Sequence, residues 1–357
     1  MALDRNSLIA LTKAMAKASM NPSASFAFEG KNLSFEALNE TFRNEMNELA
    51  GSYAKYRENK NLIFELIETG LDEVLPQKVM QSYGQFADVK TYAQGDKPVF
   101  NVRISEASKK RAKENFVTRV GLAGRYEVFK LDGYSLEVPT SAWGGAAQIG
   151  FEEFLDGRIQ MSDVYDLVLE GLDEAVFKEI AKALAAMAAS SDYTQTNGKL
   201  SKNYTTQTTF VENQMDKLLQ IADSYGKATI YCTFEFASTM IPADNGWVSD
   251  AMKQEKWDNG YYARYKGHSV IILPQSVETD ENGIINGKKV IDPSLAYIIP
   301  TGAEKPVKVA FEGTSAVREV ESQEDWSREI QTYRKFGVAT FAVNPGICIY
   351  KNTALTQ

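Results

Sequence analysis

Residues 162–190, SDVYDLVLEGLDEAVFKEIAKALAAMAAS, carry the longest helical pattern in the sequence. Their apolar residues recur every three or four positions, which places them along one side of an α-helix. Ser162 can cap the first turn, and Asp163 and Asp166 lie where the helix dipole favours negative charge. At 1.5 Å per residue the helix would be about 40 Å long, roughly a domain diameter. We therefore expect one long helix to which other segments attach.

The composition is that of a folded chain large enough for two or three domains. Its 357 residues are 44% hydrophobic and 24% charged, a balance that argues against disorder. No apolar run approaches the roughly 20 residues needed to span a bilayer, and the polar N-terminus does not resemble a signal peptide. We expect a cytosolic product with no membrane partner. Cys232 and Cys348 lie in strand-like apolar runs, so we expect buried free thiols.

Motifs for catalysis and metal binding are nearly absent. His268 is the single histidine, so a Ser-His-Asp triad or a histidine-rich zinc site would depend on it. Glycine-rich phosphate loops and the nucleophile-elbow motif are missing. We predict no cofactor and no metal. Catalysis by Asp244, Asp250 or Glu255 is a weak alternative, because no pattern aims them at one site.

The first 76 residues read as helices with little strand pattern. Residues 4–18 are amphipathic, Ser34 precedes apolar positions at helical spacing as far as Tyr56, and a further apolar run continues until Pro76. Because this pattern gives a thin core for a self-contained domain, we expect an arm that packs on other parts or other copies.

From residue 86 the pattern changes to short strand-like pieces, which predict an antiparallel ribbon. The polar segment between them, SEASKKRAKEN, has no apolar period and reads as a loop. Residues 97–130 hold nine basic and three acidic residues, a net charge of +6 within a chain of −8. Residues 143–147, WGGAA, read as a flexible elbow.

The opposite charge marks residues 152–182, which hold nine acidic and three basic residues, a net of −6. Complementary charges steer association and fix register, so the two segments can pair between neighbouring copies. Two other interpretations of the basic segment stay open. One is a solvated charged loop, and the other is a nucleic-acid contact, which no interleaved aromatic ladder supports.

The second half of the chain reads as an α/β domain followed by strands. After a polar boundary, Thr209 and Glu212 form a candidate capping box before a helix. Strand, helix and hairpin patterns alternate over residues 200–305, with Asn-Gly turns at 282–283 and 286–287. The closing residues are rich in β-branched and aromatic side chains and predict a final set of strands.

Those closing residues carry a family resemblance. IIPTGAEKPVKVAFEG and EVESQEDWSREIQTYRKFGVATFAVNPGICIYKN resemble the late segment of the major capsid proteins of tailed bacteriophages, which have the Hong Kong 97-type fold. The order of arm, ribbon, long helix, separate domain and closing strands resembles that family over nearly the whole chain. The resemblance implies an α+β fold in five parts: an N-terminal helical arm (1–76), a β-ribbon with the E-loop and the start of the peripheral domain (77–150), the peripheral domain with its spine helix (151–199), an axial domain (200–305) and C-terminal strands of the peripheral domain (306–357).

The resemblance also implies contacts between copies. In the E-loop these fall on Lys109, Lys110, Arg111, Lys113 and Arg119, and in the spine helix on Asp163, Asp166, Glu170, Asp173 and Glu174. We expect non-covalent contacts, because no motif places a lysine and Asn344 beside a catalytic carboxylate.

The implied function is that of a non-enzymatic major head protein. It would form pentamers and hexamers of an icosahedral shell around double-stranded DNA, which it contacts non-specifically on the inner face. Portal and separate scaffolding proteins are the implied partners, a decoration protein is a candidate one, and assembly takes place in the host bacterial cytoplasm. Two alternatives remain: an encapsulin-type shell around a protein cargo, and an α+β enzyme with a small-molecule pocket.

Overall fold

A computed structural model describes residues 4–20, 26–28, 31–115, 117, 131–149, 161–241, 249–280, 282–302, 304–321, 328–340 and 345–355. The chain divides into two compact units. Unit 1 comprises Met1–Pro98, Glu137–Phe177 and Val309–Val338, and unit 2 comprises Val99–Leu136, Lys178–Lys308 and Ala339–Gln357. Helices and sheets occur in both units, so the predicted α+β class is confirmed.

Unit 1 begins with a group of packed helices. They are α1 (Arg5–Met20), α2 (Phe35–Ala50), α3 (Tyr53–Thr69), a π-helical turn η1 (Gly70–Val74) and α4 (Leu75–Tyr83), with the short hairpin β1 (Phe26–Phe28) and β2 (Lys31–Leu33) between the first two. Leu38, Ile63 and Leu66 are fully buried, so the core here is thicker than expected.

Two predicted helix boundaries in this region need correction. Ser34 caps α2 as expected, but the helix does not run on to Tyr56, because Ser52 caps a new helix by accepting a hydrogen bond from the Lys55 amide. Pro76 does not stop the helix either. It lies in the first turn of α4, where a missing N–H costs little, and the π-helical turn precedes it.

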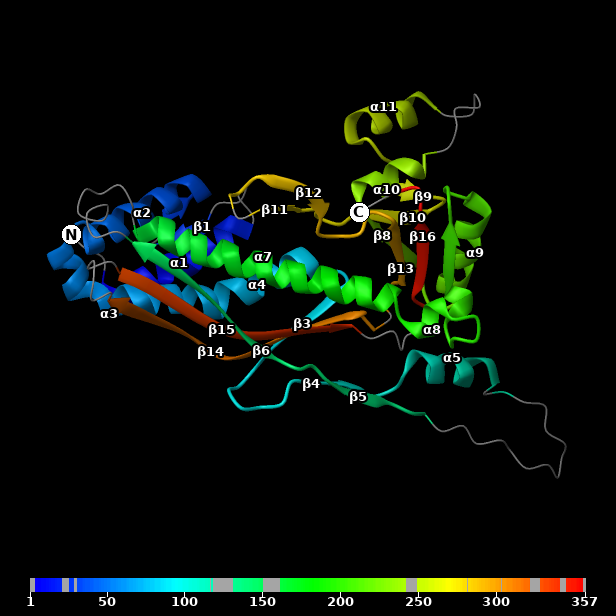
Figure 1. Ribbon diagram of the computed structural model, residues 1–357, viewed down its shortest axis with the longest axis horizontal. Coiled ribbons are helices and arrows are strands. Elements are labelled where there is room, and N and C mark those ends of the chain that lie inside the picture. Colours follow the sequence, from blue (N-terminus) through cyan, green and yellow to red (C-terminus); the bar gives the residue numbers. More distant parts are fainter. Residues whose placement is uncertain are drawn as a thin grey trace. The chain divides into compact units, whose positions relative to one another are not determined.

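A four-stranded sheet in the order β3-β14-β15-β6 forms the rest of the unit 1 framework (Figure 1). Its strands are β3 (Ala87–Tyr92), β14 (Val307–Glu321), β15 (Arg328–Thr340) and β6 (Ser141–Ile149). The predicted elbow is wrong, because Gly144 lies within β6 and pairs with Tyr333. A Cβ at Gly144 would come 2.4 Å from the Thr332 carbonyl oxygen, so glycine permits this close pairing.

One buried arginine and two partly buried carboxylates join the helices of unit 1 to its sheet. The Asp72 carboxylate accepts a hydrogen bond from the Ser315 amide (2.8 Å), and Glu68 accepts one from the Val317 amide (3.0 Å). Arg334 is only 2% exposed, pairs with Asp72 and donates to the Gly313 carbonyl oxygen (2.9 Å). The two carboxylates thus accept hydrogen bonds from backbone N–H groups of β14, which ties the helices to this strand.

The predicted long helix is present as α7 (Met161–Ala188). The helix includes Ser162, so it begins before the position predicted for its cap. In unit 1 its buried side presents Tyr165 and Val176, whereas Leu167 is 61% exposed. In unit 2 its alanine-rich end buries Ile180 and Leu184, as expected of a packed segment.

Unit 2 is built on a six-stranded sheet in the order β7-β16-β13-β8-β10-β9. Its strands are β7 (Tyr204–Gln207), β16 (Cys348–Asn352), β13 (Leu295–Pro300), β8 (Ala228–Cys232), β10 (His268–Ile272) and β9 (Arg264–Tyr265). Helix α9 (Glu212–Asp223) contributes Met215 and Leu218 to the core. The predicted capping box does not form. The Val211 amide instead donates to the Tyr350 hydroxyl (2.8 Å), which donates to the Thr209 carbonyl oxygen (3.2 Å).

Both cysteines are buried free thiols, as predicted. Burial raises the pKa of Cys232 and of Cys348 to about 12, because the thiolate loses its hydration. Neither thiol is therefore poised as a nucleophile at neutral pH.

A hairpin and several short elements complete unit 2. Strands β11 (Val277–Thr279) and β12 (Ile285–Lys289) form a hairpin around the predicted turn at 282–283, but Asn286-Gly287 lies within β12 and is not a second turn. The remaining elements are β4 (Val99–Val102), α5 (Glu106–Asn115), β5 (Tyr134–Glu137), which pairs with β4, α8 (Ser191–Thr194), the 3-10 turn η2 (Ser201–Asn203), α10 (Phe234–Thr239) and α11 (Asp250–Asn259).

Candidate functional site

The basic segment predicted to be a loop contains the helix α5. Glu106 lies in its first turn and Lys113 in its last, so both charges complement the helix dipole. The helix buries only Ser108, which explains why apolar periodicity gave no sign of it.

The basic residues predicted to contact a neighbour differ in their surroundings. Lys109 pairs with Glu106 of its own helix (2.6 Å), and Arg111 lies 3.9 Å from Asp132. Lys110 donates to the Ser224 carbonyl oxygen (3.1 Å) and lies over the Tyr225 ring. Lys113 is exposed and has no ion-pair partner in the part of the chain that the structure describes. Arg119 lies outside the described residues.

Most of the acidic residues predicted to contact a neighbour have basic partners in the same chain. Asp163 and Asp166 lie 3.7 and 3.6 Å from the Arg43 guanidinium of α2. Asp173 pairs with Lys78 of α4 (2.8 Å). Burial raises the pKa of Asp166, while Arg43 opposes that shift and Glu170 and Asp163 add to it.

Glu170 and Glu174 complete the predicted acidic set. Glu174 is only partly exposed. Glu170 is exposed, and no described residue forms an ion pair with it. Among the predicted contact residues that the structure describes, Lys113 and Glu170 are therefore the two without an ion pair to another described residue.

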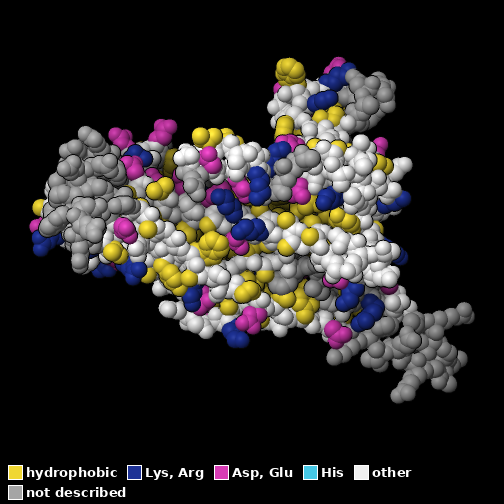
Figure 2. Space-filling model, viewed as in Figure 1, with side chains coloured by type: hydrophobic (Ala, Val, Ile, Leu, Met, Phe, Trp, Pro, Cys, Tyr) yellow, Lys and Arg dark blue, Asp and Glu magenta, His cyan; other side chains and the backbone are white. Residues whose placement is uncertain are grey.

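Helix α11 forms an exposed surface that lies outside the residues predicted to contact a neighbour. Ser249 caps it by accepting a hydrogen bond from the Met252 amide (3.3 Å), and Gly260 ends it with φ 75°. None of its residues is buried, and Trp257 is 86% exposed. Figure 2 shows hydrophobic side chains on the surface around this helix. A lone tryptophan within the charged run KQEKWDN was the available signal.

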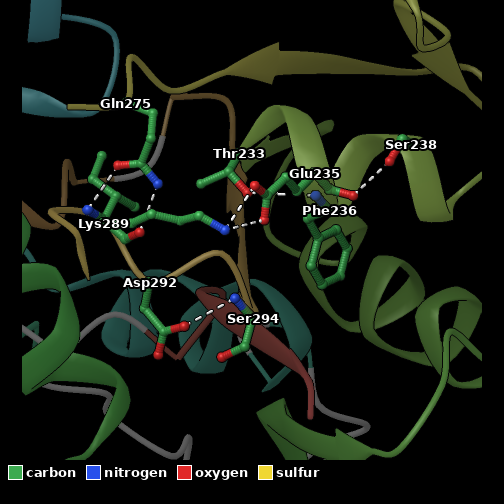
Figure 3. A network of polar contacts seen from close by, with 9 residues as sticks. Thr233, Glu235, Phe236, Ser238, Gln275, Lys289, Asp292 and Ser294 are labelled. Atoms are coloured by element: carbon green, nitrogen blue, oxygen red, sulfur yellow. Dashed lines mark hydrogen bonds and ion pairs between the residues drawn. The ribbon is translucent and has the colours of Figure 1, made fainter. Parts of the chain in front are cut away.

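The β11–β12 hairpin also exposes apolar side chains above a fixed base. Ile284 and Ile285 are 65% and 68% exposed. At the base, Lys289 pairs with Glu235 of α10 (2.7 Å), and the Gln275 side chain exchanges two hydrogen bonds with the Ile291 backbone (Figure 3). The ordered base holds the apolar tip in a defined place, which suits a contact with another molecule.

Unit 1 has an apolar groove between α7 and β6. Its volume is about 200 Å3, and its lining includes Trp143, Ala147, Leu167 and Gly171. A Cβ added at Gly171 would meet nothing within 4 Å, so this side of α7 is open.

The described residues show neither a metal-ligand cluster nor a membrane-spanning helix. Those residues contain no group of three His, Cys, Asp or Glu side chains that could hold a metal ion. No described helix is long and apolar enough to cross a membrane.

Comparison with known families decides the broad assignment. The family described as "SPbeta prophage-derived putative capsid protein YonB" matches residues 27–344, which is most of the chain. The chain belongs to this capsid-protein family. The predicted resemblance to phage capsid proteins is thereby confirmed. No curated protein sequence matches the chain.

Solved shell structures also match the chain, at low sequence identity. The head structure of Helicobacter pylori bacteriophage KHP40 has 11% identity and a TM-score of 0.47, over 76% of this chain and 90% of that one. The capsid of cyanophage P-SCSP1u has 10% identity and a TM-score of 0.47, over 77% and 88%. The virus-like particle of Pyrococcus furiosus has 12% identity and a TM-score of 0.38, over 78% and 97%.

Proposed function

We propose that this capsid protein is the major subunit of a phage head, assembling as pentamers and hexamers into an icosahedral shell around double-stranded DNA. Family membership is one support for this proposal, and the exposure of α11 is the structural one. Helix α11 has no buried residue, and its Trp257 is 86% exposed. An exposed tryptophan on an ordered helix is costly in water and typical of an interface anchor. The tip of the β11–β12 hairpin supports the same conclusion.

The chain acts as a structural component and not as an enzyme in this proposal. The capsid-protein family that matches residues 27–344 supports that role. The five-part division with arm, E-loop, peripheral and axial domains stays a prediction. Portal, scaffolding and decoration proteins are proposed as partners in the host bacterial cytoplasm, where the virion shell forms.

A contact between α5 of one copy and α7 of the next is proposed for the charged residues. Because Arg43 and Lys78 already partner several acids of α7, the contact is expected to rest on the less satisfied charges, Lys113 and Glu170. The other basic residues of α5 contribute to the field of the surface that approaches the neighbour.

A charge-swap experiment tests this contact. Lys113→Glu and Glu170→Lys should each slow assembly, and the double variant should restore it, because every copy supplies both residues. Reversing Lys109, Lys110, Arg111 and Lys113 together to glutamate should block assembly while the monomer stays folded. Normal particles from the fourfold variant would contradict the contact.

Electron microscopy of the expressed full chain tests the shell itself, and its contents separate the alternatives. Hollow closed particles, with nuclease-protected DNA when made during infection, are expected. Particles that hold a protein cargo and no DNA would favour an encapsulin-type shell. A small oligomer that turns over a small molecule would favour the enzyme.

A further inference from the structure

Unit 2 contains an open hollow of about 730 Å3 that we call the basic hollow. Its lining includes Lys199, Lys202, Lys217, Asn203, Gln214 and Tyr225, and none of the described residues that line it is acidic. In a chain whose formal charge is −8, such a concentration of one sign requires explanation.

Charge is segregated around α9, which forms one wall of the hollow. Glu212 and Asp216 both pair with Lys266, and Asp223 accepts a hydrogen bond from the Ala228 amide. At about 100° per residue these acids fall within about 40° of one another around the helix axis. Lys217 and Gln214 line the hollow from a different side of the helix. The three acidic residues of α9 therefore have partners away from the hollow.

The three lysines of the hollow have no such partners among the described residues. Lys199, Lys202 and Lys217 are exposed, and the described part of the chain offers none of them an ion pair or a hydrogen bond to its ammonium group. By contrast, Lys266 and Lys289 of the same unit have carboxylate partners at 2.6 and 2.7 Å. Three ammonium groups around one concavity repel each other until an anion enters.

The walls that carry these lysines are fixed. Asn203 is 6% exposed, and its side-chain amide donates to the carbonyl oxygens of Pro345 and Ile347, which anchors η2 and therefore Lys202. The Leu200 amide donates to the Asp192 carbonyl oxygen (2.9 Å), which fixes the turn that holds Lys199. A rigid site loses less conformational entropy when it binds.

Lys110 of α5 reaches the rim of the hollow through Ser224 and Tyr225. Glu114 lies 3.6 Å from the Lys110 ammonium, so that charge is already partly balanced. The surplus positive charge therefore belongs to the three lining lysines.

We propose that the basic hollow binds the phosphate backbone of double-stranded DNA, an inference that rests on the proposed genome-enclosing function. Lysine ammonium groups act as point charges and suit contacts with phosphate that do not depend on base sequence. Among the described residues of the lining Tyr225 is the one aromatic side chain, so these residues do not form the series of stacking platforms that a single strand would use.

The test measures binding of a fluorescein-labelled DNA duplex of about 20 base pairs by the purified full chain, as anisotropy against salt concentration. The triple variant K199Q/K202Q/K217Q should weaken binding at least tenfold. It should also lower the slope of log affinity against log salt by about 2 to 3, since each lost phosphate contact removes about 0.9. The control K253Q/K256Q/K288Q makes the same change in net charge at other exposed lysines of unit 2 and should leave both quantities nearly unchanged.

Three results would overturn the proposal: equal losses in both triple variants, no DNA binding by the unaltered chain, or stronger binding of polyglutamate than of DNA, which would indicate an acidic protein as the ligand. Shell formation is scored separately by electron microscopy. If normal shells form but DNA affinity is the same with and without the three lysines, only the proposed DNA site is wrong. If the lysines bind DNA but no shells form, only the proposed shell function is wrong.

Discussion

Helices α7 and α11 differ in what covers their side chains. On α7, Tyr165 and Val176 are buried, and Asp163, Asp166 and Asp173 have basic partners from the same chain. On α11 no residue is buried, and Trp257 faces solvent. The comparison teaches that strong charge patterning does not mark a surface as free, because the chain can neutralise it internally. An uncovered aromatic side chain is the better sign of a contact with another copy.

The largest change in stability is expected from the ion pair between Arg334 and Asp72, which lies within the chain. Arg334→Met should lower the free energy of unfolding by about 3 to 5 kcal/mol, because it leaves a partly buried Asp72 without its cation. Arg318→Met is the matched control on the neighbouring strand. Arg318 is exposed and donates to Gln331 (2.8 Å), so at most about 1 kcal/mol is expected there. Urea unfolding of both variants checks the difference, and equal losses would show that burial of the charge does not matter.

A medium effect is expected from two glycines, one packed against the covered side of α7 and one on its open side. Gly70→Ala places a Cβ 2.5 to 2.9 Å from the buried Tyr165 ring and hydroxyl, and should cost about 1 to 3 kcal/mol through overpacking. Gly171→Ala meets open space on α7 and should stabilise the chain by up to about 1 kcal/mol, since alanine favours helix. Thermal unfolding measures both. Destabilisation by Gly171→Ala would mean that this side of α7 is covered.

The smallest effect concerns the acidic face of α7. The pKa of Asp166 is raised in the folded chain, chiefly by burial, so the folded state favours the protonated carboxyl and is penalised by its charge at neutral pH. Asp166→Asn should therefore be at least as stable as the original chain at pH 7. That advantage should shrink as pH falls through the raised pKa and the original side chain becomes neutral.

Urea unfolding at pH 7 and at pH 4 measures this pH dependence. Asp163→Asn removes the same charge at an exposed position and controls for net charge. A clear loss of stability in Asp166→Asn at pH 7 would indicate that the ion pair with Arg43 outweighs the burial of the carboxylate.

Local patterns in the sequence predicted much of the fold. The apolar period of 162–190 predicted α7, Ser34 predicted the start of α2, and the apolar run around Cys232 predicted the buried strand β8. These signals are strong because burial and capping depend on residues that are close in sequence.

Other features depend on partners distant in sequence and could not be read. Gly144 looked like part of a flexible elbow, but pairing with β15 makes it part of a strand. Helix α5 buries almost nothing and so has no apolar period. Among the predicted contact residues, Lys110 and Asp173 have partners that are distant in sequence, and no local pattern predicts such partners. The exposure of Trp257 goes with the finding that no residue of α11 is buried, which only a three-dimensional view can show.

Sedimentation velocity of the full chain and its Trp257→Ser variant tests most directly whether uncovered surfaces such as α11 build the shell. Lys256→Ala, on the same exposed helix, is the control. The original chain and the control should sediment as closed particles of megadalton mass. The Trp257→Ser variant should remain as small species with an unchanged melting temperature, because Trp257 makes little contact within the chain. Shells of normal mass from Trp257→Ser, or a monomeric original chain under assembly conditions, would contradict the account.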